Sequence, residues 1–362
     1  MPRRVVTPLS RSLGLGAAQL CLIFNPTSDR RFMNIHTLTR RALLPLAAAA
    51  LLLSQSPAQA QNAANYPDRP VRIVVPFAPG AGTDAMGRLV ALKLGEILGG
   101  SFVVDNRAGA SGAIGTQHVA QQPADGYTLL LVASPFTTVA ASLPTAGYDA
   151  LRGFAPVGLV ATGPLVWASN VSLPVASMKD VVELARQKPG ALNYGSAGAG
   201  GVNHLVLEQL KAITSTDIAH IPYRGVAPAT VDMIAGQIQL VTGTIPALLP
   251  FIKDGRIKAL AVTSAKRSSA LPDVPSMSEA GFPGIDVLNY FAISAPAGTP
   301  AAVVDKLNAA LRKMVTMPDV LARFKSDAVE PAVGTPAQLA AFIEADYRAW
   351  VSVVKTQNLK IE

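Results

Sequence analysis

The sequence predicts an α/β fold with two lobes, and three observations support this fold class. Beyond residue 60, apolar runs rich in Val and Ile alternate with amphipathic helical patterns, an order of elements that builds parallel sheets. A glycine-rich turn between a strand and a helix occurs twice, at 80–84 and at 196–201. Long apolar runs at 154–167 and 285–294 are placed where the chain would cross between the two lobes.

The first sixty residues are excluded from this fold. Residues 33–60 combine a basic start, a short apolar stretch and Ala-Gln-Ala before Gln61, which is the pattern of a secretory signal peptide. Residues 1–32 resemble neither a leader nor a domain, and we interpret them as an upstream extension from a start codon assigned too early. The Arg40-Arg41 pair fits twin-arginine export, but such pairs are common in ordinary leaders, so we favour Sec export of a soluble protein.

Removal of the leader changes the charge balance. Residues 1–60 hold 7 of the 31 Lys+Arg and 1 of the 23 Asp+Glu, so the remaining 302 residues carry 24 basic and 22 acidic residues, a net +2. No basic stripe with interleaved aromatic residues remains, so we expect no nucleic-acid partner. The single cysteine, Cys21, lies upstream of the cleavage site, so the mature chain has no disulfide and no thiol nucleophile.

The first glycine turn is predicted to bind an anion. It follows a buried strand at 72–77 and precedes a helix that Thr83 or Asp84 can cap. Gly80 and Gly82 have no Cβ and allow a ligand to approach the backbone. The free amides at the helix N-terminus favour a carboxylate or a phosphate.

The next elements place a second loop at the same edge of the sheet. They are a strand, a Gly/Ala/Ser-rich loop, a short helix and a third strand, at 102–105, 107–115, 114–121 and 128–133. The third strand runs into a hydroxyl-rich loop at 134–138. Two loops at one edge predict a ligand crevice.

The second lobe repeats this arrangement. Its first helix, 178–187, begins with a near capping box formed by Ser177 and Asp180. The other expected strands and helices follow at 193–195, 202–213, 218–221, 227–235, 238–242 and 259–263. Three helices beginning at Pro300, Pro318 and Pro336 close the chain, each with proline at a tolerated first-turn position.

The first glycine turn also fits two other interpretations. Gly80-x-Gly82-x-x-Ala85 with Asp105 at the end of the next strand mimics a dinucleotide fingerprint. The loop is lengthened by Ala78-Pro79, however, and an exported protein meets little nicotinamide cofactor. A carboxylate-binding turn is therefore favoured over a structural turn and over dinucleotide binding.

No catalytic or metal-binding constellation is evident. Ser196 lies in Gly-Ser-Ala-Gly and not in G-x-S-x-G, so we interpret it as a hydrogen-bond donor. His204 and Glu208 share a helix face but supply too few ligands for zinc, which favours a surface or capping role. Other isolated candidates are interpreted as structural: Arg107, His118 and His220. We therefore expect no nucleophile–base pair and no metal.

With these residues described, the chain after residue 60 resembles a known family: the solute receptors of tripartite tricarboxylate transporters, called the Bug family of periplasmic binding proteins. The matching segments are Y-P-D-R-P-V-R-I-V-V-P-F at 66–77 with 80–84, V-D-N-R-A-G at 104–109, D-G-Y-T-L at 125–129, N-Y-G-S at 193–196, H-I-P-Y-R-G at 220–225 and A-P-A-G-T-P at 295–300.

The resemblance implies a two-lobed periplasmic-binding-protein (Venus flytrap, type II-like) fold with two crossovers. Lobe 1 would comprise 61–161 plus 288–362, and lobe 2 would comprise 162–287. A small carboxylate would be held between the lobes, partly through ordered water, and delivered to membrane transporter subunits. It further implies a periplasmic monomer without catalysis, cofactor or metal.

The resemblance also implies which residues contact the ligand. Carried over position by position, they are Phe77, Gly80, Ala81, Gly82, Thr83, Asp84, Ser134, Ser196, Ala197, Gly198, Gly200, Arg224 and Thr244. Ala81, Asn289 and Thr244 depart from the residues frequent in the family, so the resemblance does not identify the ligand. From the residues themselves, we expect backbone amides of the first turn to hold the anion, with Arg224 of minor importance.

Two other functions are retained as alternatives. One is an exported hydrolase or transferase that uses Ser134 or Ser196 on a small carboxylate or ester. The other is an adaptor that binds a protein partner.

Overall fold

The computed structural model describes residues 65–80, 82–359 and 361. The predicted signal peptide, the upstream extension and Ala81 lie outside these residues. The described elements are β1 Val71–Val75, α2 Gly82–Leu98, β2 Phe102–Asn106, η1 Ala110–Gly112, α3 Ala113–Ala120, β3 Thr128–Ala133, α4 Pro135–Ser142, β4 Phe154–Asn170, α5 Met178–Gln187, β5 Asn193–Ser196, α6 Val202–Thr214, β6 Ala219–Pro222, α7 Val226–Ile234, β7 Leu240–Thr244, α8 Ile245–Lys253, β8 Ile257–Val262, β9 Leu288–Pro296, α9 Ala301–Met314, α10 Pro318–Ser326, β10 Glu330–Pro331 and α11 Pro336–Thr356.

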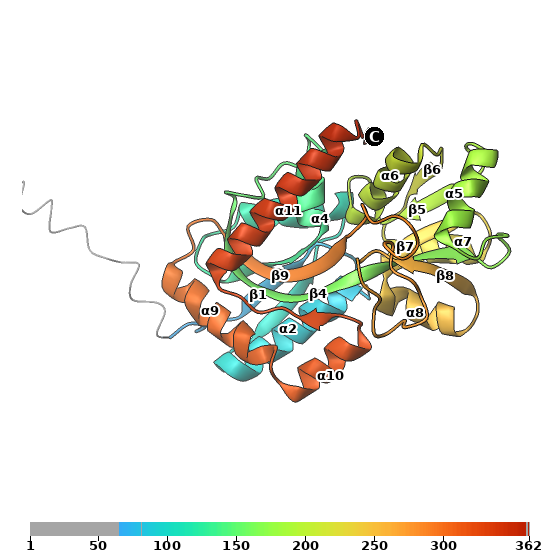
Figure 1. The fold of residues 1–362 in the computed structure, drawn as a ribbon. Helices are drawn as coiled ribbons and strands as arrows, with labels where there is room; N and C mark the ends of the chain where they lie inside the picture. Colours follow the sequence, from blue (N-terminus) through green and yellow to red (C-terminus); the bar gives the residue numbers. More distant parts are fainter. Residues whose placement is uncertain (1–64, 81, 360, 362) are drawn as a thin grey trace, which may run out of the picture. The chain divides into compact units, whose positions relative to one another are not determined.

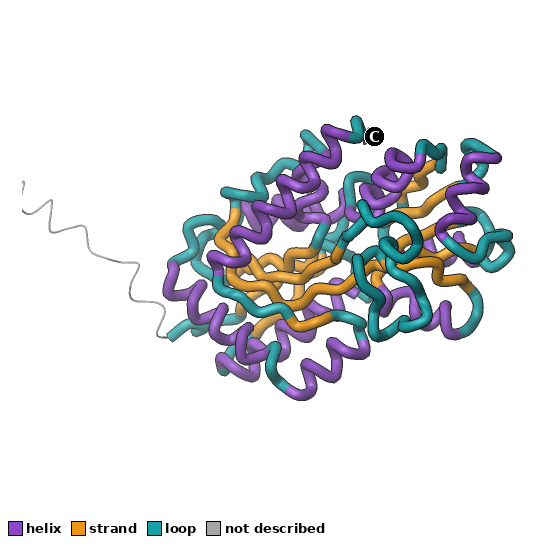
Figure 2. Tube along the Cα trace, viewed as in Figure 1, coloured by secondary structure: helices purple, strands orange, loops and turns teal. Residues whose placement is uncertain are grey.

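One path of paired strands runs through the molecule, in the order β2-β1-β3-β9-β4-β7-β5-β6, with β8 and β10 also paired to β4. β1 pairs in parallel with β2 and β3, and β5 pairs in parallel with β6 and β7. β9 and β4 lie between these two parallel groups. β9 pairs antiparallel with β3 and with β4, and β4 pairs antiparallel with β7. Figure 2 shows the strands as a continuous band with helices on both sides.

β4 belongs to both halves of this band. Its first part, from Phe154 to Pro164, pairs with β9, and its second part, from Leu165 to Asn170, pairs with β7 and β8. We use lobe 1 for the elements packed around β1, β2, β3 and β9, and lobe 2 for those packed around β5 to β8. The two-lobed α/β fold expected from the sequence is confirmed, and both expected crossover runs fall at the junction.

Each lobe has apolar cores on both faces of its strands. In lobe 1, α2 and α9 cover one face, whereas α3, α4 and the first half of α11 cover the other (Figure 1). In lobe 2, one core includes α5 and α6 and the other includes α7 and α8. The amphipathic helices predicted between the strands supply these cores, as expected for layers of helix on sheet.

The last helix does not stay on lobe 1 as the sequence suggested for 288–362. Leu339 and Ile343 in its first half join a core of lobe 1, while Trp350 in its second half is buried in a core of lobe 2. A helix of 21 residues is about 31 Å long, enough to span both lobes. The sequence shows the helix but not which partner covers each part of its apolar face.

Element boundaries mostly agree with the sequence, with one clear error. The helix 178–187 begins at its predicted capping box, in which Ser177 accepts from the Asp180 N–H. The segment 134–138 was expected to be a loop, but α4 begins within it at Pro135. The sequence does contain a signal for this start, because proline at the first helical position is pre-organised for a helix.

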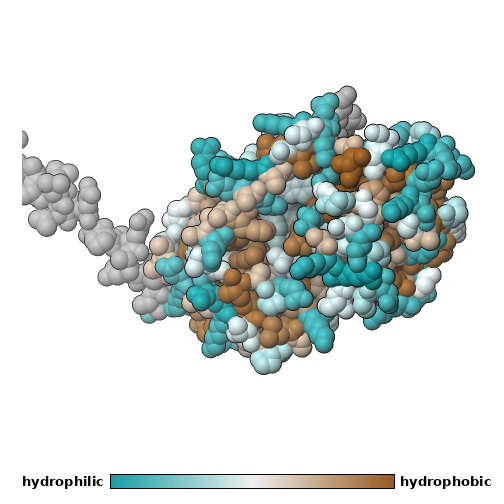
Figure 3. Space-filling model, viewed as in Figure 1, coloured by the Kyte–Doolittle hydropathy of each residue, from teal (hydrophilic) through white to brown (hydrophobic). Residues whose placement is uncertain are grey.

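Among the helices that the structure describes, none is both long and apolar enough to cross a membrane. On the face drawn in Figure 3, the brown apolar areas are interrupted by hydrophilic residues. Exposed apolar side chains are scattered over several elements, as is normal for protein surfaces.

We expect Trp350→Ala to destabilise the protein by about 3–5 kcal/mol, because Trp350 is only 6% exposed and its removal leaves a cavity in lobe 2. Lys355→Ala, on an exposed position of the same helix, is the matched control and should change stability by less than about 0.5 kcal/mol. Urea unfolding of both variants measures the difference. Equal midpoints would show that α11 does not pack on lobe 2.

Candidate functional site

The first glycine turn is held by a buried carboxylate. Asp84 is 3% exposed, and its Oδ2 accepts from the Gly80 N–H at 2.9 Å and from Arg88 Nε at 2.9 Å. Its Oδ1 accepts from Asn106 Nδ2, which also donates to the Phe77 carbonyl. In this conformation Asp84 and the Gly80 amide are bonded to each other, and their contact with a ligand stays a prediction.

Asp84 is charged in this arrangement. Burial alone would raise the pKa of Asp84, but hydrogen bonds from Arg88, Gly80 and Asn106 outweigh burial and lower the pKa below its usual value. The charge is balanced by Arg88, so Asp84 braces the turn without a net negative charge at the start of α2.

Gly82 and Thr244 face each other across the two lobes. A Cβ placed on Gly82 would lie 3.3 Å from Thr244 Oγ1. Gly82 is the first residue of α2, and Thr244 precedes α8 with a side chain that makes no capping hydrogen bond. The positive N-terminal ends of two helices, one from each lobe, therefore meet here, with the half-buried Thr83 in the first turn of α2.

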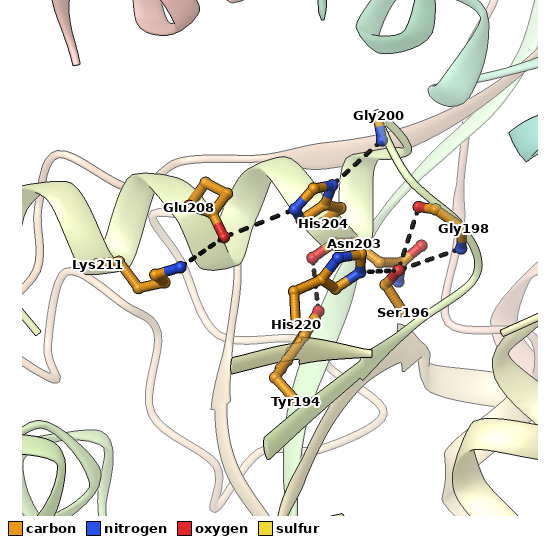
Figure 4. Close-up of polar contacts among 9 residues, drawn as sticks. All are labelled: Tyr194, Ser196, Gly198, Gly200, Asn203, His204, Glu208, Lys211 and His220. Carbon is orange, nitrogen blue, oxygen red and sulfur yellow. Dashed lines mark hydrogen bonds and ion pairs between the residues drawn. The ribbon is translucent and has the colours of Figure 1, made fainter. Parts of the chain in front are cut away.

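The second glycine turn is braced by a serine–histidine pair (Figure 4). Ser196 Oγ lies 2.6 Å from His220 Nε2 and accepts from the Gly198 N–H at 3.1 Å. A separation of 24 residues along the chain conceals this contact, in which Ser196 donates to the Gly198 carbonyl and His220 has a structural role, as interpreted from the sequence. Ala197 lies half-buried inside this turn.

A second imidazole completes the brace. The ring of His204 stacks on that of His220 with centroids 3.6 Å apart. His204 Nδ1 accepts from the Gly200 N–H at 3.2 Å, and Glu208 and Lys211 continue the network along α6. His204 is 3% exposed, so the predicted surface role is wrong. Its bond to the Gly200 N–H, just before α6, agrees with the alternative prediction of a capping role.

The serine–histidine pair is arranged to hold the turn. Ser196 is 0% exposed, so a substrate cannot reach its hydroxyl in this conformation. Burial, followed by the nearby His204, lowers the pKa of His220 to about 4, so the ring is neutral near pH 7. A neutral ring and a serine hydroxyl together fix the Gly198 amide and carbonyl.

Ser134 and Arg224 lie differently from their expected positions. The Ser134 side chain is buried and points to β9, where it bonds Asn289 Oδ1 at 2.9 Å and accepts from the Tyr290 N–H at 3.0 Å. Its hydroxyl therefore fixes the start of β9 against the start of α4 within lobe 1. Arg224 is exposed, and no hydrogen bond or ion pair joins it to another described residue.

One residue at the junction of the lobes was missed. Ser111 of η1 donates to the Ala199 carbonyl in the second glycine turn, at 2.8 Å. The sequence showed only a Gly/Ala/Ser-rich loop here, with Ser111 between Ala110 and Gly112. A small cavity of about 10 Å³, room for about one water, lies beside Phe77, Ser111 and Gly112.

Within residues 65–359, apart from Ala81, no group of three His, Cys, Asp or Glu side chains is placed to hold a metal ion. The site consists of backbone amides, hydroxyls and small residues.

β4 and β9 join the two lobes, and between the lobes Gly82 of α2 meets Thr244 before α8, and Ser111 meets the second glycine turn. The chain belongs to the tripartite tricarboxylate transporter receptors: the family model described as "Tripartite tricarboxylate transporter family receptor" matches residues 86–359. Members of this family are solute-binding receptors and not enzymes, which argues against the hydrolase alternative.

Relatives and solved structures agree with this family. Protein BugT of Bordetella pertussis is 35% identical over 303 residues, covering 83% of this chain and 93% of BugT. The structure "R. palustris Rpa4515 with adipate" is 37% identical with a TM-score of 0.78, covering 82% of this chain and 99% of that chain. "MatC (Rpa3494) from Rhodopseudomonas palustris with bound malate" is 29% identical with a TM-score of 0.75, covering 80% and 100%.

We expect His220 to titrate near pH 4 in the folded protein, well below the ordinary value of 6.5. Because the folded pKa is the lower one, His220 stabilises the protein above pH 6.5, and this contribution is lost as the pH falls from 6.5 through 4. A two-dimensional NMR titration of the imidazole resonances measures the value. A midpoint near 6.5 would show that the ring is not buried against His204.

Proposed function

We propose that this receptor works in the periplasm, as its family does, and captures a small carboxylate between its lobes for delivery to membrane transporter subunits. The observation that carries the proposal is the meeting of Gly82 at the start of α2 with Thr244 at the start of α8. Helix N-termini favour anions, and two of them from different lobes can share one carboxylate when the lobes close.

The relatives support this ligand class. Rpa4515 was solved with adipate and MatC with malate, both of which are small dicarboxylates. The mature net charge of +2 and the absence of acidic residues in the first turns of α4, α6, α7 and α8 are compatible with an anionic ligand.

We propose that backbone amides hold the ligand. The residues retained from the sequence for direct contact are Phe77, Ala81, Gly82, Thr83, Ala197, Gly198, Gly200 and Thr244. Gly80, Asp84, Ser134 and Ser196 position these turns through their own hydrogen bonds. Arg224, exposed and outside these networks, contributes long-range attraction only.

We also propose lobe boundaries at 61–161 plus 288–362 and at 162–287, with the end of α11 resting on lobe 2. The cavity beside Phe77 is about 10 Å³, whereas ligand pockets usually measure about 300–1,000 Å³. A ligand can enter there only if the lobes separate, so we propose hinge motion at β4 and β9.

A thermal-shift screen of carboxylates that includes malate and adipate tests the function. A ligand at 100 times its dissociation constant should add about 2.7 kcal/mol, a shift of several degrees. No shift with any small carboxylate would favour an adaptor for a protein partner, and turnover of a bound ester would reverse the assignment.

We expect Gly82→Val to weaken binding at least about 100-fold, because the new side chain meets Thr244 and displaces the amides from the ligand. Gly284→Val is the matched control, since a Cβ at Gly284 meets nothing within 4 Å, and it should bind normally.

Isothermal titration calorimetry measures binding by Gly82→Val, Gly284→Val and Arg224→Ala. Arg224→Ala should weaken binding less than about tenfold, or about 1.4 kcal/mol. If Arg224→Ala loses a thousandfold and Gly82→Val binds normally, a salt bridge from lobe 2 holds the ligand and the amide mechanism is wrong.

A further inference from the structure

Ser111 inserts from lobe 1 into the second glycine turn of lobe 2. Its Oγ donates to the Ala199 carbonyl at 2.8 Å. A Cβ built on Gly198 would lie only 2.5 Å from Ser111 Oγ, and one built on Gly201 would lie 3.4 Å from it. The side chain is 8% exposed. Glycine at position 198 is therefore needed for the two lobes to approach, whereas a Cβ at Gly201 would be in ordinary van der Waals contact with Ser111.

The backbone that carries Ser111 has an uncommon conformation. Four consecutive residues, from Gly109 to Gly112, have positive φ, including the non-glycine residues Ala110 at 46° and Ser111 at 53°. Positive φ is unfavourable for residues with a Cβ and persists where the surroundings hold it. Here the Gly112 N–H donates to the Gly109 carbonyl at 2.9 Å and closes the turn within lobe 1, while the Ser111 side chain is held by the Ala199 carbonyl of the other lobe.

The surface that receives Ser111 is fixed within lobe 2 itself. The Gly198 N–H is bonded to Ser196, whose hydroxyl contacts His220, and the Gly200 N–H is bonded to His204. These bonds involve no residue of lobe 1. The turn can therefore keep its shape when the lobes separate, ready to accept Ser111 again.

We propose that Ser111 is a latch residue: it docks between Gly198 and Gly201 when the lobes close and slows dissociation of the bound solute. This role rests on the proposed function, because the latch closes over the same site. Ser111 is a positioning residue, since it acts on the ligand through the closed state.

A disulfide tests the latch without any ligand. The Cβ of Gly198 and that of Ser111 would be 3.7 Å apart, within the 3.5–4.5 Å of disulfides. With oxidised glutathione, the double variant Ser111→Cys, Gly198→Cys should therefore form an intramolecular disulfide, releasing two reduced glutathione molecules and lowering the intact mass by two hydrogens. The control Ser111→Cys, Gly225→Cys should show no such mass change, only mixed disulfides with glutathione, because Gly225 has a similar φ of 129° but nothing within 4 Å.

Binding of malate and adipate then separates the latch from the proposed function. The oxidised Ser111→Cys, Gly198→Cys protein should bind neither probe, and reduction should recover binding in part, since the side chain at position 198 remains. If the disulfide forms but the wild type binds no carboxylate, the contact between Ser111 and Gly198 stands and the proposed function fails. An intramolecular disulfide formed equally well in the control pair overturns the latch.

Dissociation rates give a second test. Ser111→Ala should release a bound probe about fivefold faster, the effect of one neutral hydrogen bond. Ser142→Ala is the control, since its Oγ reaches the Gly200 carbonyl only at 3.5 Å, and it should change the rate less than twofold. An unchanged rate for Ser111→Ala overturns the proposal.

A double-mutant cycle excludes a general defect of the loop. Gly198→Ala alone should weaken binding, because its Cβ meets Ser111 Oγ at 2.5 Å. Adding Ser111→Ala removes that oxygen and should recover part of the loss, although the same change weakens binding in the wild type. Additive losses would contradict contact between the two residues.

Discussion

Both lobes share one strand, and the rest of the structure depends on it. β4 donates and accepts backbone hydrogen bonds with β9 in its first part and with β7 and β8 in its second. A register shift of one residue would exchange Trp167, buried in one core of lobe 2, with Val166 and Ala168, which are buried in the core on the other face of the sheet. The pairing of β4 therefore fixes the relative placement of the strands on which both glycine turns are mounted.

Each glycine turn is braced by polar groups of its own lobe. Asp84 with Arg88 and Asn106 holds the first turn, and His220 with His204 and Ser196 holds the second. Turns that are fixed before a ligand arrives lose little entropy on binding. Small residues such as Gly82 and Gly198 then occupy the surfaces that meet between the lobes, and they allow these surfaces to approach closely.

The sequence predicted those features that depend on neighbouring residues. The alternation of strands and helices, the capping box at Ser177 and the two glycine turns all follow from local patterns. The pairing of Ser196 with His220, the bond from Gly80 to Asp84 and the contact of Ser111 with Ala199 depend on how the chain folds back. No periodicity or spacing encodes these contacts. The sequence therefore predicted several residues of the site but not the residues to which they are bonded.

The path of α11 has a mechanical consequence. Phe342 packs on Tyr290 of β9 with ring centroids 4.9 Å apart, and the same helix runs along β4 before Trp350 reaches lobe 2. Three segments therefore connect the lobes: β4, β9 and α11. In the proposed hinge motion, three connections allow rotation about one axis and resist twisting, so the same residues meet at each closure.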